Sequence, residues 1–310
     1  MGERMSQKWF ITGANGNLGR RLVQKLLDEH DVVAVVRSDK AADTLAKLPL
    51  EVDAKNRLTV KVLSYTDEQA LAEAAQGCHR AVHLVGILKE GGGARYVDAH
   101  EASTQALLSA LAQSSITHVT YLSIVGSHAE SNNACLASKG RAEDMFRADT
   151  SPQKTLASTV LRVPMVLGEG DYASFALKKR ASQGLSFSFR AGSLEQPIYA
   201  GDVVAAIIVA GTGQIDQTLD LAGPCAMTRN ELTHKAAQVL GTEARVVSLP
   251  MFLGYGLAWL FEKALPNPPF TAAMIGVLDH DDLVESKAAW EQLGLQPTSL
   301  EDTLTAVLTG

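Results

Sequence analysis

A glycine-rich segment between a strand and a helix constrains this chain more than any other feature. Residues 8–12, Lys-Trp-Phe-Ile-Thr, are typical of a buried strand, and residues 18–27 repeat apolar side chains at helical spacing. The glycines between them suit a tight turn, a close approach of phosphate to the backbone, and helix–sheet packing. We therefore expect a dinucleotide site with its pyrophosphate at the helix N-terminus, although a turn that merely tightens packing is the alternative. The expected cofactor contacts are Gly13, Asn15, Gly16, Asn17, Leu18 and Gly19.

Short apolar runs alternate with helical patterns through the first half of the chain. This alternation predicts an α/β protein with a Rossmann-type, doubly wound parallel sheet. The predicted strands are 32–36, 58–63, 81–85, 119–123, 159–163 and 219–221, and the predicted helices are 68–75, 97–113, 139–147, 203–209 and 229–240. For the last helix, Thr228 is the expected N-cap and Gly241 the expected stop.

The regular alternation of predicted strands and helices ends after Pro164, where glycines divide the chain into shorter segments. We expect residues 1–165 to form an NAD(P)-binding Rossmann domain, to which 197–222 return. Residues 166–196 and 223–310 would then form a smaller, interleaved C-terminal substrate lobe.

Composition excludes several classes of protein. The 310 residues carry a net charge of −6, which argues against a nucleic-acid partner, since binding to phosphates needs a basic surface. The three cysteines are widely spaced and indicate neither a disulfide framework nor a metal site, so a reducing compartment is expected. Residues 1–8 are polar, and no apolar stretch is long enough to span a membrane. We therefore expect a cytoplasmic protein without a transmembrane segment or metal.

The end of the second predicted strand bears on the choice of dinucleotide. An NAD site usually has Asp or Glu there, which accepts hydrogen bonds from the ribose hydroxyls. Here the strand ends in Arg37-Ser38. Because an arginine offers bidentate donors to a 2′-phosphate, Arg37 and Ser38 favour NADP(H) over NAD(H). A surface arginine that covers the sheet edge is the alternative.

Several motifs together resemble the short-chain dehydrogenase/reductase superfamily, in its extended and atypical branches. They are the T-G-x-x-G-x-x-G spacing with Arg37 and the segments 81–86 (A-V-H-L-V-G), 119–126 (V-T-Y-L-S-I-V-G), 161–168 (L-R-V-P-M-V-L-G), 197–203 and 220–232. The resemblance runs from about Lys8 to beyond Leu240. The L-V-G-I sequence after the fourth strand and the C-terminal region resemble the branch with the NAD(P)H-binding accessory subunit of complex I and the NmrA-like proteins. The resemblance implies cofactor contacts from Val85, Gly86, Lys139, Pro164, Met165 and Val166.

The resemblance also implies a catalytic centre, in which one residue departs from the family's pattern. The family uses Tyr-x-x-x-Lys: the lysine holds the nicotinamide ribose, and the tyrosine exchanges a proton with the substrate. Lys139 matches the lysine, and Ser123 matches a serine that orients the substrate. Cys135 stands at the tyrosine position. The ordinary pKa of a thiol, about 8.5, permits proton exchange, but its sulfur reaches less far than a phenol.

Three hypotheses follow from Cys135. The protein could use Lys139, Ser123, Cys135 or a cofactor-bound water in place of the tyrosine. It could instead bind the nucleotide as a sensor or structural subunit with little turnover. A displaced phenol could also serve, and the candidates are Tyr121, Tyr96 and Tyr172. For Tyr121 we favour core packing, and for Cys135 a small buried side chain that fills the space of the tyrosine.

Residues 249–265 are strongly apolar and rich in aromatic side chains. Three roles compete, in order of preference: a helix that closes the substrate pocket or packs in the core, an oligomer contact, and a helix lying on a membrane surface.

Taken together, the sequence predicts an NADP(H)-dependent oxidoreductase that acts on a hydrophobic small molecule. The rival is a non-catalytic NAD(P)H-binding regulator, or an assembly or accessory protein of a respiratory complex.

Overall fold

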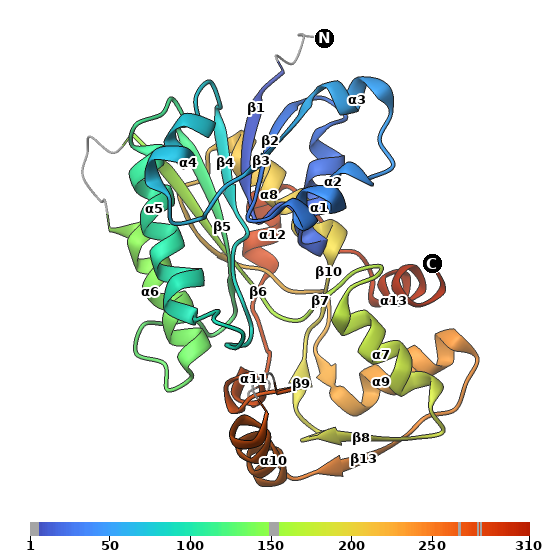
Figure 1. Ribbon diagram of the computed structural model, residues 1–310. Coiled ribbons are helices and arrows are strands. Elements are labelled where there is room, and N and C mark those ends of the chain that lie inside the picture. The colour runs from blue at the N-terminus through green and yellow to red at the C-terminus, as the bar shows by residue number, and fades with distance from the viewer. Residues whose placement is uncertain (1–5, 149–154, 266–267, 278, 280) are drawn as a thin grey trace.

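A twisted parallel sheet forms the centre of the protein (Figure 1). The computed structural model describes residues 6–148, 155–265, 268–277, 279 and 281–310; the first five residues of the polar start and part of the predicted first domain, 149–154, therefore lie outside it. Within the described residues the order of the parallel strands is β11-β6-β5-β4-β1-β2-β3. Their bounds are β1 (Lys8–Thr12), β2 (Asp31–Val36), β3 (Leu58–Val62), β4 (Arg80–His83), β5 (His118–Ile124), β6 (Ala157–Val163) and β11 (Gln217–Asp220).

This strand order confirms the predicted Rossmann-type fold. The chain runs outward from β1 to β3, then returns to the other side of β1 and continues from β4 to β11. The direction therefore reverses between β1 and β4, and in open α/β sheets ligands bind beyond the carboxyl ends of the strands at such a point.

Helices cover both faces of the sheet, and each face has its own hydrophobic core (Figure 1). One core contains side chains of α1 (Asn17–Leu26), α2 (Asp39–Ala46), α8 (Ala200–Gly213) and α12 (Lys287–Leu293). The other contains side chains of α4 (Glu68–Ala74), α5 (Ser103–Leu111) and α6 (Ala134–Arg147). The π-helical turn η1 (Val97–Ala102) leads directly into α5, and α3 (Val52–Asn56) lies on the surface.

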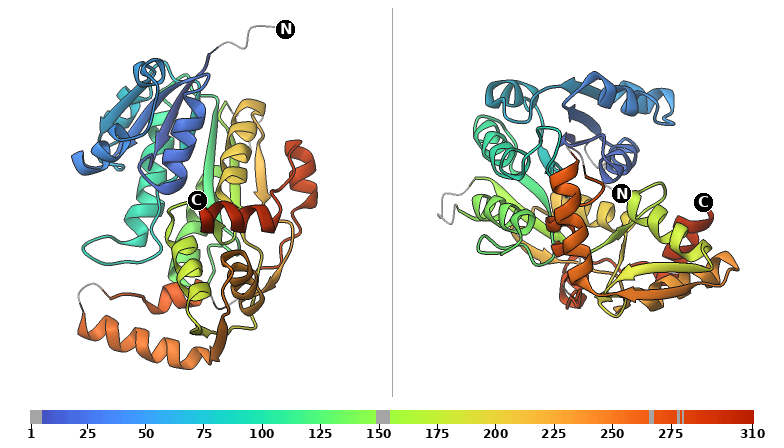
Figure 2. Two further views of the ribbon diagram at one scale, coloured as in Figure 1. Left: turned by 90° about the vertical axis from the view of Figure 1, so that its right-hand side faces the viewer. Right: turned by 60° about the horizontal axis from the view of Figure 1, so that its bottom comes forward.

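The remaining elements gather beyond the carboxyl edge of the sheet (Figure 2). A third hydrophobic core joins α7 (Tyr172–Ser182), α9 (Arg229–Leu240) and α13 (Leu300–Thr309). Small two-stranded sheets pair β7 (Val166–Leu167) with β10 (Ile198–Tyr199), β9 (Leu194–Glu195) with β12 (Met227–Thr228), and β8 (Leu185–Phe189) with β13 (Arg245–Leu249). Helices α10 (Met251–Ala264) and α11 (Ala272–Val277) complete this part. The predicted division into two lobes at residue 165 stays a prediction.

The helices near the site differ from the expectation, although most predicted elements are present. The helix predicted from Lys139 begins at Ala134, because the side chain of Asn133 accepts hydrogen bonds from the Cys135 and Leu136 amides and caps it. The helix predicted over 97–113 divides into η1 and α5. The segment 166–196, expected to be irregular, contains α7. The predicted start of α9 at Thr228 is confirmed by a capping box, and its stop by left-handed Gly241.

Helix α10 exposes most of its apolar side chains. Phe252 is 70% and Trp259 62% exposed, and only Gly254 and Ala258 of this helix are buried. Core packing is therefore the wrong expectation for most of α10, while an oligomer contact and a membrane contact stay predictions. Among the residues that the structure describes, no helix is both long and apolar enough to cross a membrane.

Candidate functional site

The turn between β1 and α1 forms a cradle in which two glycine positions leave no room for a side chain. Gly13 has a φ of +77°, and a Cβ there would lie 2.9 Å from the carbonyl carbon of Leu84. A Cβ on Gly19 would lie 2.6 Å from the carbonyl oxygen of Ala14. Exposed Gly16 caps α1 without a side-chain hydrogen bond, so the first N–H groups of α1 remain directed at an incoming ligand. The cradle fits a pyrophosphate at a helix N-terminus.

The other predicted cofactor residues lie around the carboxyl edge of the sheet but differ in what their side chains contact. Asn17 donates a hydrogen bond to the Glu169 carbonyl oxygen, and Asn17 Oδ1 accepts one from Arg21, so its side chain ties α1 to the loop after β7. Arg37 is exposed, whereas the Ser38 hydroxyl accepts from the Ala41 amide and caps α2. Partly or fully buried positions are Asn15, Leu18, Val85, Pro164, Met165 and Val166.

Lys139 lies in the interior, beside the end of β4. Its side chain is buried, and its Nζ donates a 2.8 Å hydrogen bond to the Leu122 carbonyl oxygen. The same Nζ lies 4.6 Å from the centre of the Tyr121 ring, and a Cβ on Gly86 would lie 3.1 Å from it. Burial lowers the pKa of Lys139 to about 8, against the opposing influence of Cys135 and Glu143. This lysine is therefore mostly charged at neutral pH and loses its charge as the pH rises through about 8.

Tyr96 brings a phenol to Cys135 from another part of the chain. The Tyr96 hydroxyl donates a 2.9 Å hydrogen bond to the Leu88 carbonyl oxygen and lies near enough to the Cys135 thiol for each group to shift the pKa of the other. Cys135 Sγ lies 3.6 Å from the Ile87 carbonyl oxygen. Burial raises the pKa of Cys135 to about 11 and raises that of Tyr96 further above its ordinary value, with help from Cys135 and Glu90. A thiol with such a pKa is protonated, as expected for a small buried side chain.

His100 completes the group of side chains around residues 86–88. Its Nε2 lies 3.1 Å from both the N and the O of Ile87, and its ring stacks on Tyr96 with 5.6 Å between ring centres. Burial lowers the pKa of His100 to about 3, and the charge of Lys139 acts in the same direction. His100 is therefore neutral. Because η1 carries it, the π-helical turn lies directly beside this group, and such turns are frequent at functional sites.

Ser123 faces a different set of partners. Its hydroxyl donates a 2.5 Å hydrogen bond to Glu143, a fully buried carboxylate on α6. Glu143 also accepts hydrogen bonds from Arg162 and Arg147. The donor capacity of Ser123 is therefore taken by Glu143.

Tyr121 lies in the core, as the sequence favoured. Its side chain is fully buried, and its ring stacks on Phe146 and on His83. Tyr172, the third candidate phenol, is 79% exposed at the start of α7. Of the three candidates, Tyr96 is the one whose hydroxyl hydrogen-bonds within the segment 86–88.

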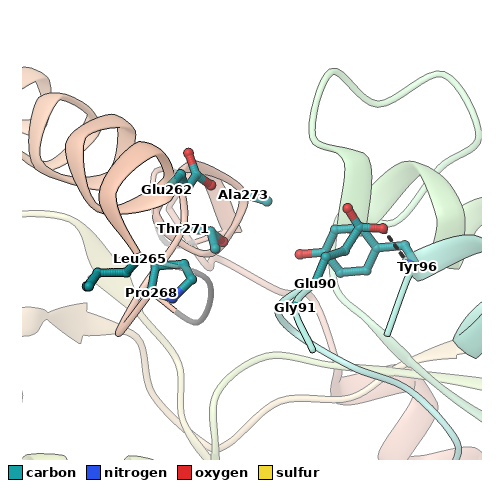
Figure 3. A pocket seen from close by; sticks show the side chains of 8 residues that line it. All are labelled: Glu90, Gly91, Tyr96, Glu262, Leu265, Pro268, Thr271 and Ala273. Carbon is teal, nitrogen blue, oxygen red and sulfur yellow. Dashed lines mark hydrogen bonds between the residues drawn. The ribbon is translucent and has the colours of Figure 1, made fainter. Parts of the chain in front are cut away.

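A cavity of about 340 Å³ opens beside Tyr96 (Figure 3). Glu90, Gly91 and Tyr96 line it on one side, with the Tyr96 amide donating a 2.7 Å hydrogen bond to Glu90. Across the cavity lie Glu262, Leu265, Pro268, Thr271 and Ala273, from the end of α10, the segment that follows it and the start of α11. The C-terminal end of α10 thus borders the cavity, which combines apolar and acidic surfaces.

The sequence analysis missed much of the group of side chains around residues 86–88 and of the cavity beside it. His100, Glu143, Glu90 and Glu262 belong to no recognisable pattern in the sequence. Only the missing tyrosine at Cys135 gave a signal, because it raised the question of a displaced phenol. Among the described residues, no group of three or more His, Cys, Asp or Glu could hold a metal ion.

Comparisons with known proteins agree with this geometry. A family model described as NAD(P)H-binding matches residues 13–184, more than half of the chain. The NADH-ubiquinone oxidoreductase 40 kDa subunit, mitochondrial, of Neurospora crassa is 21% identical over 94% of this chain and 76% of its own length. The decarboxylating sterol-4-alpha-carboxylate 3-dehydrogenase of Dictyostelium discoideum is 26% identical over 52% of this chain and 54% of its own.

Solved structures share the fold over almost the whole chain. UDP-N-acetylglucosamine 4-epimerase from Bacillus cereus has a TM-score of 0.71 at 17% identity, covering 97% of both chains. MoeE5 in complex with UDP-glucose and NAD has a TM-score of 0.74, also at 17% identity and 97% coverage of both chains. The resemblance expected from the sequence, including that to the complex I subunit, is confirmed.

Proposed function

Because this chain belongs to the NAD(P)H-binding family, we propose that it is an NADP(H)-dependent oxidoreductase whose reaction takes place between Lys139 and Tyr96. The observation that carries the proposal is the placement of Lys139, Cys135, Tyr96 and His100 around residues 86–88, next to a cavity and to the glycine cradle. When bound, the nicotinamide supplies or accepts the hydride.

Lys139 has two tasks in this proposal. Its ammonium group holds a ribose hydroxyl by hydrogen bonding, and its charge favours ionisation of nearby acids. The Leu122 carbonyl oxygen fixes Nζ in place at 2.8 Å, so that the group is oriented before the ligand arrives. Ser123 acts through the strand: by holding Glu143 it fixes β5 against α6 and positions Lys139, one helical turn before Glu143.

Tyr96 exchanges the proton with the substrate oxygen. Its phenol borders the cavity and lies near Cys135, the residue that stands where the family places its tyrosine. The short Cys135 side chain leaves room for this phenol and keeps the thiol as a hydrogen-bonding neighbour. A charged ligand beside Tyr96 would have to lower its raised pKa before the phenol could act as a base, whereas donation of its proton needs no such change.

The cavity suits a small molecule with an apolar body and one oxygen group. Leu265, Pro268 and Ala273 offer apolar surface, and Tyr96 and Thr271 offer hydroxyl groups. We propose a hydrophobic carbonyl or alcohol as the substrate, and NADP(H) as the cofactor because Arg37 stands exposed at the end of β2. Three separated cysteines suit a reducing compartment such as the cytoplasm.

The first experiment is a fluorescence titration of the purified protein with NADPH and NADH, repeated with Arg37→Ala. We expect tighter binding of NADPH, and loss of that preference in the variant, since a guanidinium–phosphate pair is removed. A screen of hydrophobic carbonyl compounds for NADPH consumption follows. Equal affinity for both nucleotides would reject the NADP(H) assignment, and absent binding of both would reject the function.

A non-catalytic NAD(P)H-binding subunit is the second candidate. Two observations favour it: Cys135 replaces the usual tyrosine, and α10 exposes Phe252, Leu257 and Trp259 as a face that another protein could cover. The similarity to a subunit of NADH-ubiquinone oxidoreductase supports the same view. Tight NADPH binding without turnover of any compound in the screen, together with a larger assembled species in cells, would select this candidate.

A further inference from the structure

A network of side chains joins the first turn of α1 to the loop that follows β7. Asn17, the first residue of α1, donates a 3.2 Å hydrogen bond from Nδ2 to the Glu169 carbonyl oxygen, and its Oδ1 accepts a 2.9 Å hydrogen bond from Arg21 Nε. Arg21 Nη2 donates a 2.7 Å hydrogen bond to the same carbonyl oxygen. The helix therefore holds the main chain of this loop through two of its side chains.

The Glu169 carboxylate closes the network. One of its oxygens lies 2.6 Å from Arg21 Nη2, and the other accepts a 2.7 Å hydrogen bond from the Tyr199 hydroxyl. Tyr199 is itself held, because β10 pairs it with Leu167 of β7 (Figure 1). Burial acts to raise the pKa of Glu169, but hydrogen bonds, among them those from Tyr199 and Arg21, lower that pKa below its ordinary value. The carboxylate is therefore ionised, and we call Asn17, Arg21, Glu169 and Tyr199 the latch.

The two segments that the latch joins belong to opposite halves of the sheet. The turn before α1 follows β1, from which the chain runs outward to β3, whereas β7 follows β6, in the half that runs from β4 to β11. A Rossmann-type sheet consists of two mononucleotide-binding halves, and a dinucleotide lies across the point where they meet. The latch therefore crosses the same boundary that a bound dinucleotide would cross.

On this basis, which rests on the proposed cofactor site, we propose that the latch positions the two halves of the site for a whole dinucleotide: it fixes the phosphate cradle and the loop after β7 at the spacing that one NADPH molecule requires. A ligand that spans both halves gains affinity when these are held in place beforehand. A ligand that fills only one half gains nothing from their spacing. The latch therefore favours the whole dinucleotide over its fragments.

Calorimetry with two ligands tests this role without any substrate. NADPH spans both halves, and 2′,5′-ADP fills the adenosine half alone. Glu169→Gln and Arg21→Gln each break the ion pair. We expect each to weaken NADPH binding by about tenfold and to change 2′,5′-ADP binding by less than about twofold. The double variant should lose no more NADPH affinity than either single variant, since the same contact is broken in all three.

Asp28→Asn is the matched control. It breaks an exposed ion pair with Lys25 and removes one negative charge just beyond the other end of α1, so neither ligand should respond to it. Tyr199→Phe is a milder variant, which removes one hydrogen bond from the Glu169 carboxylate and keeps the ion pair. It should weaken NADPH binding by about threefold, the equivalent of one partly exposed hydrogen bond, and leave 2′,5′-ADP binding unchanged.

Several results would overturn the inference. Tighter binding of both ligands by Glu169→Gln would mean that the carboxylate only repels the phosphates. Equal weakening of both ligands would mean either a direct contact with the phosphates that they share or a loosened fold, and thermal denaturation separates these two causes. Unchanged NADPH binding, or additive losses in the double variant, would mean that Arg21 and Glu169 do not act as a pair. If the wild type binds neither ligand, the proposed function itself fails, and this inference with it.

Discussion

The two ends of the candidate site are built differently, one from backbone groups and the other from side chains. The phosphate end consists of backbone: three glycines within seven residues and the free N–H groups of α1 form it. The proposed reacting end consists of side chains of α6, of η1 and of Tyr96, the residue before η1, which meet around residues 86–88. One end is local in sequence and the other is assembled by the fold.

If the proposed function is right, this difference means that nucleotide binding and the reaction can change independently. A backbone cradle tolerates few substitutions, since any Cβ at Gly13 or Gly19 meets main-chain atoms that cannot move aside. A side-chain cluster can exchange members, as long as one phenol reaches the reacting position. Under the proposed function, Cys135 at the position of the family's tyrosine, with Tyr96 nearby, would be an exchange of this kind. Substitutions at the two ends should therefore affect different measurements.

The largest effect is expected at the phosphate end. Gly13→Ala combines a left-handed backbone, which costs a non-glycine residue about 1–2 kcal/mol, with overpacking against Leu84, which costs about 1–3 kcal/mol. Nucleotide affinity should fall by about 100-fold or more. A fluorescence titration with NADPH measures it.

Gly77→Ala provides the matched control. Gly77 also has a positive φ, +70°, but a Cβ there meets nothing within 4 Å. The variant should lose some stability and keep its nucleotide affinity. If both variants lost affinity equally, strain in the fold and not the shape of the cradle would be the cause.

The next effect should separate reaction from binding. Tyr96→Phe removes the phenol proton but keeps the ring that stacks on His100. Turnover should fall by about 100-fold, as is typical for loss of a general acid, while NADPH affinity stays within a factor of about two, because no contact to the phosphates is lost. Steady-state kinetics with the best carbonyl compound of the screen measures it.

Tyr121→Phe is the control for this prediction, because its hydroxyl is buried in the core beneath Lys139. An equal loss of turnover in both tyrosine variants would mean that Tyr96 acts through packing alone. A loss in Tyr121→Phe only would move the proton-transfer role to that residue.

The contrast between the two ends also explains which parts of the fold and of the candidate site could be predicted from the sequence. The strands from β1 to β6 and the glycine turn follow from patterns within ten residues: buried parallel strands such as β1 and β2 need continuous apolar runs, and the partly exposed edge strand β3 alternates apolar with polar residues. The group of Tyr96, His100 and Cys135 depends on how η1 packs against α6, which no local pattern encodes. The start of α6 was missed for a similar reason: its cap, Asn133, lies in a polar loop with several equivalent candidates.

A smaller effect is expected from Ser123, and it concerns stability. Ser123→Ala removes a hydrogen bond to the buried Glu143 carboxylate, and bonds to charged groups contribute about 1.5–3 kcal/mol. Urea denaturation should show a loss of about 2 kcal/mol, with nucleotide affinity unchanged. Ser127→Ala is the control, because Ser127 is equally buried and its hydroxyl has no hydrogen-bonding partner among the described residues. Lower turnover at unchanged stability would instead indicate that Ser123 orients the substrate, as the family resemblance implies.

The smallest effect is a pH dependence that should have opposite signs in binding and in stability. Lys139 has a pKa of about 8 in the folded protein, below its ordinary 10.5. From pH 7 to 9 its ammonium loses the proton, so NADPH affinity should fall by about threefold, the weight of one weakened hydrogen bond. Between about pH 8 and 10.5, however, the unfolded chain holds a proton that the folded chain has released, so a rise in pH favours the folded state.

Lys139→Met is the variant that tests both signs, since it keeps the length of the buried chain and cannot titrate. Its NADPH affinity should not change between pH 7 and 9. Its stability should lose the gain that the wild type shows between pH 8 and 10.5, measured by urea denaturation at each pH. A wild-type affinity that stays level across this range would mean that Lys139 does not contact the nucleotide, and the reacting end would then have to be placed away from it. A stability that falls with pH in the wild type relative to the variant would mean that Lys139 is charged in the folded state, held by partners stronger than the Leu122 carbonyl.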